Sequence, residues 1–250
     1  MNRKDVLIII PAYNEEKNLG AVLDELNKPP YNEYADILVI NDGSTDRTAD
    51  IAREHGATVI SNVYNMGYGV ALQLGYKYAV RRDYPYLIQM DGDGQHDLCN
   101  VEKIYTELRT PDVDGKTPDI VLGGRFMKGS SEFKTSVLKK VAYALFRFLI
   151  RMFSHARISD PTTGLQGLKL EAYSEYAGYK KFDDKYPDAN MITQMILMGY
   201  KVKEIPAVMH QRISGKSMHS GIVAPIIYMI RMTLSITAVY FRVKLSQKKK

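Results

Sequence analysis

Short apolar runs alternate with amphipathic stretches along the first hundred residues. Four apolar runs of strand length end at turn-forming residues: 6–10, 37–40, 57–61 and 86–90. Between them, apolar residues at helical spacing predict three helices: 15–27, 70–81, and one from Ser44 or Thr45 to about 55. Strands that alternate with helices in this way predict an α/β fold with a mostly parallel, Rossmann-like sheet and helices on both of its faces.

Polar clusters follow three of the predicted strands. They occupy residues 13–15, 41–44 and 91–95. In open parallel sheets, ligands bind beyond the carboxyl ends of the strands. We therefore expect the three clusters to face one ligand-binding crevice.

One of these clusters carries two carboxylates separated by a single glycine. Asp91 and Asp93 follow an apolar strand, and Gln95 adds a further oxygen one alternation later. Carboxylates this close repel each other unless a cation is shared or one is protonated. Oxygen ligands of this kind suit Mg²⁺ or Mn²⁺, which also bind substrate phosphates. The simpler alternative is a polar turn without a metal, but the position at a strand end favours the metal.

The second half of the chain is less regular. Its pattern predicts strands over 120–122 and 202–205, a helix over 137–153 and a Thr/Gly-rich loop over 160–167. In the helix, Lys140, Arg147 and Arg151 fall on one stripe. The opposite side carries apolar residues: Val141, Leu145, Phe148, Leu149 and Met152. Such a helix suits an anionic membrane surface, unless its apolar side packs on the core.

The C-terminal stretch 222–241 is apolar and long enough to span a bilayer. Arg231 lies at its midpoint, where insertion costs about 2.5–3.5 kcal/mol, and Pro225 disturbs its first turn. An interfacial helix, or a helix packed on a membrane partner, fits better than a lone span. We therefore expect a main domain over 1–220, and a membrane- or partner-associated helix with a basic tail over 221–250.

The net charge and the cysteine count indicate the cellular compartment and the kind of binding partner. The chain has 250 residues, a net charge of +6 and one cysteine, Cys99. A single cysteine excludes an internal disulfide and favours a reducing compartment, and no secretory signal is visible. A basic surface suits nucleic acid, anionic lipid or phosphorylated substrates. Nucleic acid is least favoured, because the basic residues alternate with aliphatic rather than aromatic positions. We expect peripheral attachment to the cytoplasmic side of the cell membrane.

Four motifs, in order, resemble the signatures of family-2 inverting glycosyltransferases with the GT-A fold. They are PAYNEEKNL at 11–19, INDGSTD at 40–46, NMG at 65–67 and MDGDGQH at 90–96. Later segments resemble the branch that includes dolichyl-phosphate mannose synthase and bacterial polyprenyl-phosphate glycosyltransferases. These segments are GR at 124–125, DPTTGLQ at 160–166 and RISGKS at 212–217.

The resemblance implies roles for individual residues. It places the nucleoside of the donor against four residues: Pro11, Tyr13, Glu15 and Asp42. It assigns the metal to Asp91, Asp93 and Gln95, and the donor diphosphate to Arg212, Lys216 and Ser217. Arg125 would bind a phosphate of donor or acceptor. The chain has Gly164-Leu165-Gln166 where mannose synthases usually have Gly-Phe-Arg, which leaves open how an acceptor phosphate is held.

The activity expected from this resemblance is metal-dependent transfer of a sugar from a UDP-, GDP- or dTDP-sugar to a polyprenyl phosphate. In the alternative, the acceptor is a saccharide hydroxyl in cell-wall or surface polysaccharide synthesis, and a carboxylate must take its proton. Asp160 and Asp188 are the candidates for that base. A membrane subunit or self-association would supply further membrane contacts. A non-catalytic membrane subunit and a sugar-phosphate nucleotidyltransferase are less favoured, the latter because 11–15 is not a glycine-rich, basic pyrophosphate loop.

Overall fold

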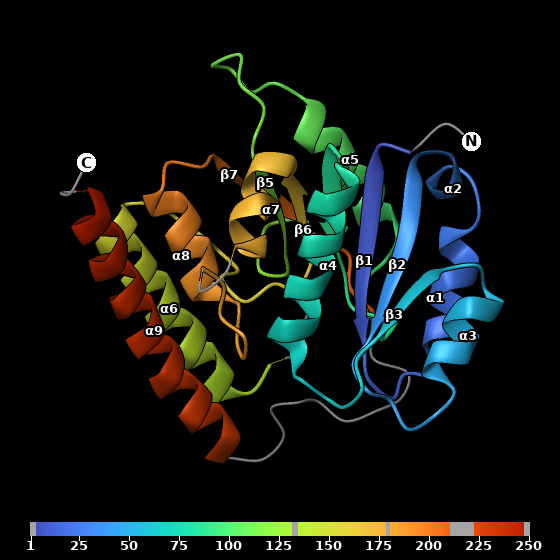
Figure 1. Cartoon of the computed structure of the whole chain (residues 1–250). Helices are drawn as coiled ribbons and strands as arrows, with labels where there is room; N and C mark the ends of the chain where they lie inside the picture. Colours follow the sequence, from blue (N-terminus) through green and yellow to red (C-terminus); the bar gives the residue numbers. More distant parts are fainter. Residues whose placement is uncertain (1–3, 132–134, 179–180, 211–222, 248–250) are drawn as a thin grey trace.

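The computed structural model describes residues 4–131, 135–178, 181–210 and 223–247. Within these ranges a seven-stranded sheet forms the centre of the molecule (Figure 1). Its strands are β1 Val6–Ala12, β2 Ala35–Asn41, β3 Thr58–Ser61, β4 Tyr86–Gln89, β5 Ile120–Gly124, β6 Gln166–Lys169 and β7 Val202–Pro206. The strand order is β3-β2-β1-β4-β6-β5-β7. Only β6 is antiparallel to its neighbours β4 and β5, so the expected mostly parallel sheet is confirmed.

Alternate side chains of β1 enter two hydrophobic clusters, one on each face of the sheet. Leu7 and Ile9 belong to one cluster, and Val6, Ile8 and Ile10 belong to the other. All seven residues of the strand are buried, because side chains of a strand point alternately to opposite faces and both faces are covered here. This explains why the sequence has a continuous apolar run at this position.

Helices cover both faces, as expected. The helices are α1 Leu19–Leu26, α2 Tyr31–Tyr34, α3 Thr48–Glu54, α4 Tyr68–Arg82, α5 Cys99–Arg109, α6 Val137–Ser154, α7 Leu170–Ala177, α8 Ala189–Leu197 and α9 Val223–Gln247. One cluster receives side chains from α1, α3 and α5, and the other from α4, α6, α7, α8 and α9. Figure 1 shows α6, α8 and α9 side by side at one edge of the molecule.

Two predicted helix starts are wrong. The helix expected from residue 15 begins at Leu19, because Asn14 has a φ of 55° and Glu15 accepts a turn hydrogen bond from Asn18 N at 3.0 Å. The helix expected from Ser44 or Thr45 begins at Thr48. Asp46 Oδ1 accepts from the Thr48 backbone N–H at 2.9 Å, so residues 46–48 form a turn closed by the aspartate side chain, and the helix begins only after it.

Three elements were not identified from the pattern: β6, α5 and the short helix α2. Gln166–Lys169 forms β6, although the sequence predicted a loop up to residue 167. Here the strand lies between β4 and β5, and Gly167 permits that packing, because an added Cβ would lie 2.1 Å from Ile104 Cγ2. The second missed element is α5, which buries Val101, Ile104 and Leu108 against the sheet.

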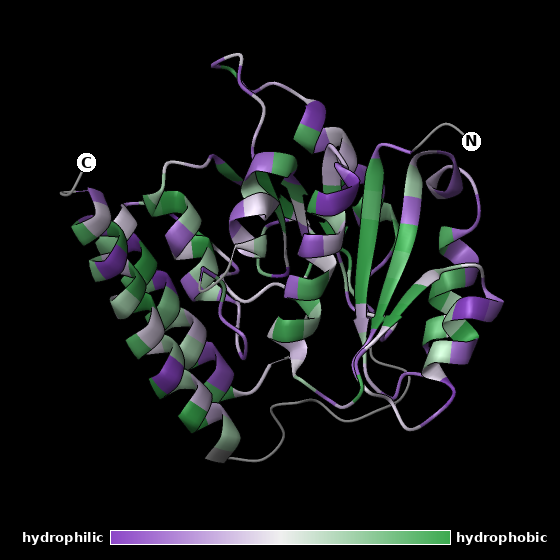
Figure 2. Cartoon of the chain, in the orientation of Figure 1, coloured by the Kyte–Doolittle hydropathy of each residue, from purple (hydrophilic) through white to green (hydrophobic). Residues whose placement is uncertain are grey.

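Helix α6 is present as predicted, but its expected apolar side is only partly buried: Leu149 is in the core and Leu145 packs against it. It places Ala142, Tyr143, Phe146, Leu149 and Ile150 in the core. Of the side expected to be apolar, Val141, Phe148 and Met152 are exposed. Figure 2 shows hydrophobic residues on α6 and α9 at the edge of the molecule as well as in the interior. Among the described residues, the one helix long and apolar enough to cross a membrane is 224–247, within α9.

Candidate active site

The predicted polar loops lie at the carboxyl ends of β1, β2 and β4. These strands are parallel neighbours, with Ala12 paired to Asn41 and Ile9 paired to Gln89. Their carboxyl ends therefore lie at the same edge of the sheet, toward the lower side of Figure 1. The three clusters expected to share one crevice are brought together.

The loops after β1 and β2 are joined by hydrogen bonds. Asn14 N donates to Ser44 Oγ at 3.0 Å, and Glu15 N donates to Thr48 Oγ1 at 2.8 Å. Pro11 is buried within β1, whereas Tyr13 is exposed at the tip of the first loop. The two loops form a fixed polar rim with one accessible aromatic ring.

Asp42 organises the neighbouring loop. Its Oδ1 accepts from Asn62 Nδ2 at 2.7 Å and from Met66 N at 2.9 Å, and its Oδ2 accepts from Gly67 N at 2.8 Å. Gly43 before this loop is required, because it has a φ of 69° and an added Cβ would lie 2.4 Å from the Tyr64 carbonyl carbon. Asp42 is almost fully buried, so it holds the 62–67 segment in place at the crevice.

The acidic pair lies directly after β4. The Asp91 side chain is 35% exposed and accepts a hydrogen bond from the Tyr68 hydroxyl at 3.1 Å. Asp93 is buried, and its Oδ1 accepts from Gln95 N at 3.0 Å. His96 Nε2 lies 3.4 Å from Asp91 Oδ2, and the buried Nδ1 of the same ring has no hydrogen-bond partner in the described structure.

The side chains at this site fit a dication whose coordination shell is completed by a substrate. Within the described ranges, no three His, Cys, Asp or Glu side chains converge as a complete metal site. Mg²⁺ and Mn²⁺ in phosphate-transfer sites are commonly held by one or two carboxylates, with substrate phosphates and water completing the shell. Asp91 is the accessible carboxylate of the pair, and Asp93 shapes the loop behind it.

A buried hydrogen-bond network holds the Tyr68 hydroxyl, which in turn positions Asp91. Gln89 Nε2 donates to the Tyr68 hydroxyl at 3.2 Å and to Gly164 O at 2.9 Å, and Tyr76 donates to Gln89 Oε1. Burial, together with the Asp91 carboxylate, raises the pKa of Tyr68 well above its ordinary value. The Tyr68 hydroxyl therefore stays protonated and continues to donate to Asp91.

Arg125 and Asp160 form a buried ion pair. Arg125 Nε and backbone N donate to Asp160 Oδ2 at 2.7 and 2.9 Å, and Nη2 donates to Oδ1 at 2.8 Å. Nη2 also donates to Thr162 Oγ1 at 2.8 Å. Burial lowers the pKa of Arg125, but hydrogen bonds to Asp160 and its charge outweigh this and raise the pKa overall. Asp160 is fully buried, so it holds Arg125 and is poorly placed to act as a base.

Asp188 lies at the start of α8 and meets the first turns of α9. Its Oδ2 accepts from the Tyr228 hydroxyl at 2.7 Å. Desolvation raises the pKa of Asp188 to about 6, while Tyr228 and Arg125 oppose the rise. The side chain keeps partial exposure. A carboxylate with this pKa can accept a proton near neutral pH, so of the two candidates Asp188 is the better placed.

Three predicted residues lie outside the described ranges: Arg212, Lys216 and Ser217. The chain enters that segment beside the acidic loop, because His210 N donates to Gln95 O at 2.7 Å and His210 Nε2 lies 2.8 Å from Asp97 Oδ2.

Sequence reasoning missed three contributors to the site. Tyr68 and His96 each had a local signal, since Tyr68 follows the 65–67 motif and His96 follows Gln95 directly. Tyr228 had no such signal, because its contact with Asp188 depends on how α9 packs against α8.

In open α/β sheets the ligand site lies beyond the carboxyl ends of the strands, which is where the acidic, glycine-containing loops of this chain meet. A family model described as glycosyl transferase family 2 matches residues 7–177. The chain belongs to this family and is a glycosyltransferase.

Relatives support the polyprenyl-phosphate branch. The chain is 28% identical to polyprenol monophosphomannose synthase of Mycolicibacterium smegmatis, over 86% of this chain and 81% of the relative. It is 27% identical to undecaprenyl-phosphate mannosyltransferase of Micrococcus luteus, over 86% of this chain and 88% of the relative.

Solved structures confirm the GT-A-like fold. Mannosyl-3-phosphoglycerate synthase from Rubrobacter xylanophilus has a TM-score of 0.65 at 18% identity, over 98% of this chain and 75% of that chain. A mannosyltransferase from Pyrobaculum calidifontis, solved with GDP-Man and Mn²⁺, has a TM-score of 0.60 at 16% identity, over 99% of this chain and 76% of that chain.

Proposed function

We propose that this glycosyltransferase moves a sugar from a nucleotide-sugar to a polyprenyl phosphate at the cytoplasmic face of a membrane, with inversion, using Mn²⁺ or Mg²⁺. The observation that carries the proposal is the partly exposed Asp91 carboxylate, fixed by Tyr68 at the edge where the nucleotide loops meet. Relatives named for polyprenol and undecaprenyl phosphate favour the lipid acceptor.

The donor would lie across the loops after β1, β2 and β4. The nucleoside would rest between Tyr13 and the 62–67 segment, which Asp42 holds in position. The diphosphate would then reach Asp91, next to Gln95. A bound dication would neutralise the charge that develops on the departing nucleoside diphosphate. The structural neighbour solved with GDP-Man and Mn²⁺ supports a divalent metal together with a nucleotide-sugar donor.

The acceptor would approach from the side of Arg125 and Asp188. A lipid phosphate is already an anion, so it needs no strong base. Asp160 pairs with the guanidinium of Arg125 at the end of β5 and would hold it beside the acceptor. Donor contacts would then lie at the first strands, and acceptor contacts around β5 and α8.

One observation favours a second candidate, a saccharide hydroxyl as acceptor. Attack by a hydroxyl requires proton removal, and the pKa of Asp188 is raised by burial to about 6. In this case Asp188 would take the proton, and Tyr228 would hold the carboxylate in position.

An acceptor panel tests the proposal. Purified protein with Mn²⁺ and labelled UDP-, GDP- or dTDP-sugars is offered either a polyprenyl phosphate or an oligosaccharide. We expect label to enter the organic-solvent phase with the polyprenyl phosphate alone. Label in the oligosaccharide alone would replace the lipid acceptor with the second candidate. An Asp91→Asn protein serves as the background in both arms.

A further inference from the structure

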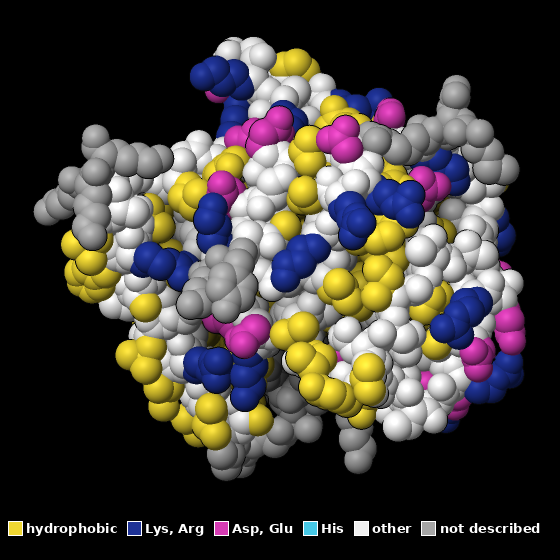
Figure 3. All heavy atoms as spheres, viewed as in Figure 1, with side chains coloured by type: hydrophobic (Ala, Val, Ile, Leu, Met, Phe, Trp, Pro, Cys, Tyr) yellow, Lys and Arg dark blue, Asp and Glu magenta, His cyan; other side chains and the backbone are white. Residues whose placement is uncertain are grey.

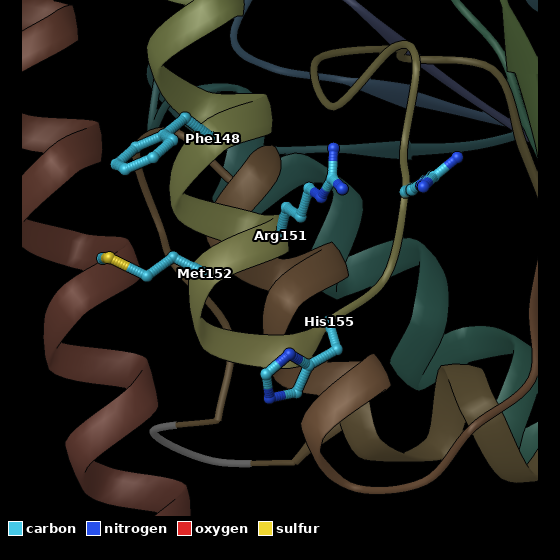
Figure 4. Close-up of a pocket in the computed structure, with 5 residues that line it drawn as sticks. Phe148, Arg151, Met152 and His155 are labelled. Atoms are coloured by element: carbon cyan, nitrogen blue, oxygen red, sulfur yellow. The ribbon is translucent and has the colours of Figure 1, made fainter.

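His96 differs from the other described histidines because its ring is buried beside a carboxylate of the site. Its side chain is 4% exposed, whereas those of His55 and His210 are 27% and 56% exposed. His155 is exposed at a pocket of about 570 Å³ at the end of α6, which Arg151 also lines (Figure 4). A buried polar ring has lost its hydrogen bonds to water, so its contacts inside the protein decide what it does.

The surroundings of the His96 ring decide which nitrogen carries its proton. Nε2 lies 3.4 Å from Asp91 Oδ2, and Nδ1 is buried without a hydrogen-bond partner in the described structure. A neutral imidazole has one N–H donor and one lone-pair acceptor, and an ionised carboxylate can only accept. A proton on Nδ1 would leave a buried donor unpaired and would make two lone pairs face each other. The neutral ring therefore carries its proton on Nε2 and donates to Asp91.

This donation gives Asp91 a hydrogen-bond donor on each carboxylate oxygen. The Tyr68 hydroxyl donates to Oδ1 at 3.1 Å, and His96 reaches Oδ2. Gly164 closes a third side, because an added Cβ there would lie 3.0 Å from Asp91 Oδ2 and 3.2 Å from the Tyr68 hydroxyl. A carboxylate oxygen has two lone-pair sites, so one donor does not saturate it. Rotation of the carboxylate would break both hydrogen bonds, so the two donors fix its orientation.

The backbone of His96 is held by residues 207–210. His96 forms an antiparallel bridge with Met209. Asn100, fully buried in the first turn of α5, donates from Nδ2 to Val208 O at 2.7 Å and accepts from Val208 N at 2.9 Å. The contact of the ring with the carboxylate is longer than an ordinary N–H···O bond of about 2.7–3.2 Å. The position of the ring therefore depends on this backbone pairing rather than on the contact itself.

The same segment is joined to the loop after β5. Ser131 Oγ accepts from Met209 N at 2.6 Å and donates to Met209 O at 3.1 Å. Ala207 N donates to Gly124 O at 3.0 Å. Residues 207–210 are thus held from two sides and give the ring a fixed base.

We propose that His96 is a positioning residue of the metal site: it donates from Nε2 to Asp91 and, together with Tyr68, aims this carboxylate at the dication that binds the donor. The inference rests on the proposed function for the presence of the metal, whereas the hydrogen bond belongs to the protein alone. Hydrogen bonds to metal-binding carboxylates fix their orientation, and loss of such a partner commonly weakens metal binding by roughly 10–100-fold.

Two variants of similar size separate the hydrogen bond from packing. Glutamine keeps an amide N–H near the position of Nε2, whereas leucine fills a similar volume without a donor. We expect His96→Gln to bind Mn²⁺ within about threefold of the wild type, and His96→Leu to bind it roughly 10–100-fold more weakly. The control His55→Leu removes another histidine–aspartate contact, of 2.7 Å with Asp24, and should bind Mn²⁺ like the wild type. Electron paramagnetic resonance of free Mn²⁺ measures binding of the metal alone to each full-length protein.

Binding of Mn²⁺ to carboxylates elsewhere on the protein is opposed by neighbouring cations. Figure 3 shows exposed Asp and Glu side chains among Lys and Arg side chains on the face that it views. Asp112, for example, lies 2.6 Å from Lys203 Nζ and 3.2 Å from Lys201 Nζ. A dication at such a carboxylate would be repelled by these ammonium groups, so the titration reports mainly on the acidic loop.

The tautomer of His96 is measured without metal or donor. Nitrogen-15 NMR of histidine-labelled protein distinguishes a protonated ring nitrogen from an unprotonated one, and His96→Gln identifies the signals. We expect Nε2 to be protonated and Nδ1 to be unprotonated. The opposite tautomer, Mn²⁺ binding by His96→Gln no tighter than by His96→Leu, or equal loss in the His55→Leu control would overturn the proposal. If the wild type binds no Mn²⁺, the proposed function fails, and the tautomer alone then decides whether His96 holds Asp91.

Discussion

Replacement of Asp188 by Asn tests two properties of this carboxylate: the stability lost when it ionises in a buried position, and its ability to accept a proton during turnover. The pKa of Asp188 is raised from 3.8 to about 6, chiefly by desolvation. The folded protein thus binds this proton more tightly than the unfolded chain does. Wild-type stability falls as pH rises from about 4 through about 6, where the carboxylate ionises. Asparagine stays neutral and can still accept from Tyr228.

The size of the effect follows from the shift. Each pKa unit corresponds to about 1.4 kcal/mol, so two units set an upper limit near 3 kcal/mol. Because the side chain keeps partial exposure, we expect about 1–2 kcal/mol. The Asp188→Asn protein should therefore match the wild type near pH 4 and be more stable by about 1–2 kcal/mol near pH 8.

Urea unfolding at both pH values measures this difference, because other titrating groups cancel between the two proteins. With a hydroxyl acceptor, turnover of the same variant should fall by about 10²–10⁴ while donor binding is retained. A difference in stability that does not change with pH, or a variant less stable than wild type near pH 8, would show that burial does not raise the pKa of Asp188.

Three further substitutions test the surrounding geometry. Asp160→Asn should lower the free energy of unfolding by about 3–5 kcal/mol, because it breaks a buried ion pair. The control Asp50→Asn breaks an exposed pair and should change the free energy of unfolding by less than about 1 kcal/mol. Similar values for both variants would show that burial adds nothing to the cost of breaking the Arg125–Asp160 pair. Gly69→Ala should cost about 1–3 kcal/mol in thermal unfolding, since its Cβ would lie 2.5 Å from Asp183 O, and an unchanged melting temperature would exclude that contact. Tyr228→Phe removes a donor to the carboxylate, so the pKa of Asp188 should rise by about one unit. NMR titration of that carboxyl should detect the rise, and a fixed pKa counts against the bond.

The sheet and the polar loops could be predicted because their signals are local. The apolar run over 6–10 lies within β1, which is buried on both faces, and Asp91 follows the end of β4, which pairs with β1. Parallel pairing then brings the loop ends together without further information. The existence of α6 was predictable for the same reason, since its helical spacing is continuous.

Other features depend on contacts between distant segments. The strand Gln166–Lys169 exists because β4 and β5 accept it between them, and its four residues carry too little pattern of their own. The sequence left Asp160 and Asp188 as equal candidates for a base. Only the fold distinguishes them, by placing Arg125 against Asp160 and Tyr228 against Asp188. Which face of α6 is buried was likewise decided by its packing against α8 and α9.

Calorimetry of donor binding in Mn²⁺ tests whether the acidic loop after β4 joins the protein to the donor diphosphate through a dication. We expect the wild type to bind at least one of the UDP-, GDP- or dTDP-sugars in Mn²⁺, and Asp91→Asn to weaken this binding by roughly a hundredfold while the protein stays folded. Equal binding by wild type and Asp91→Asn, or undiminished binding after the metal is chelated, would contradict this role of the acidic loop.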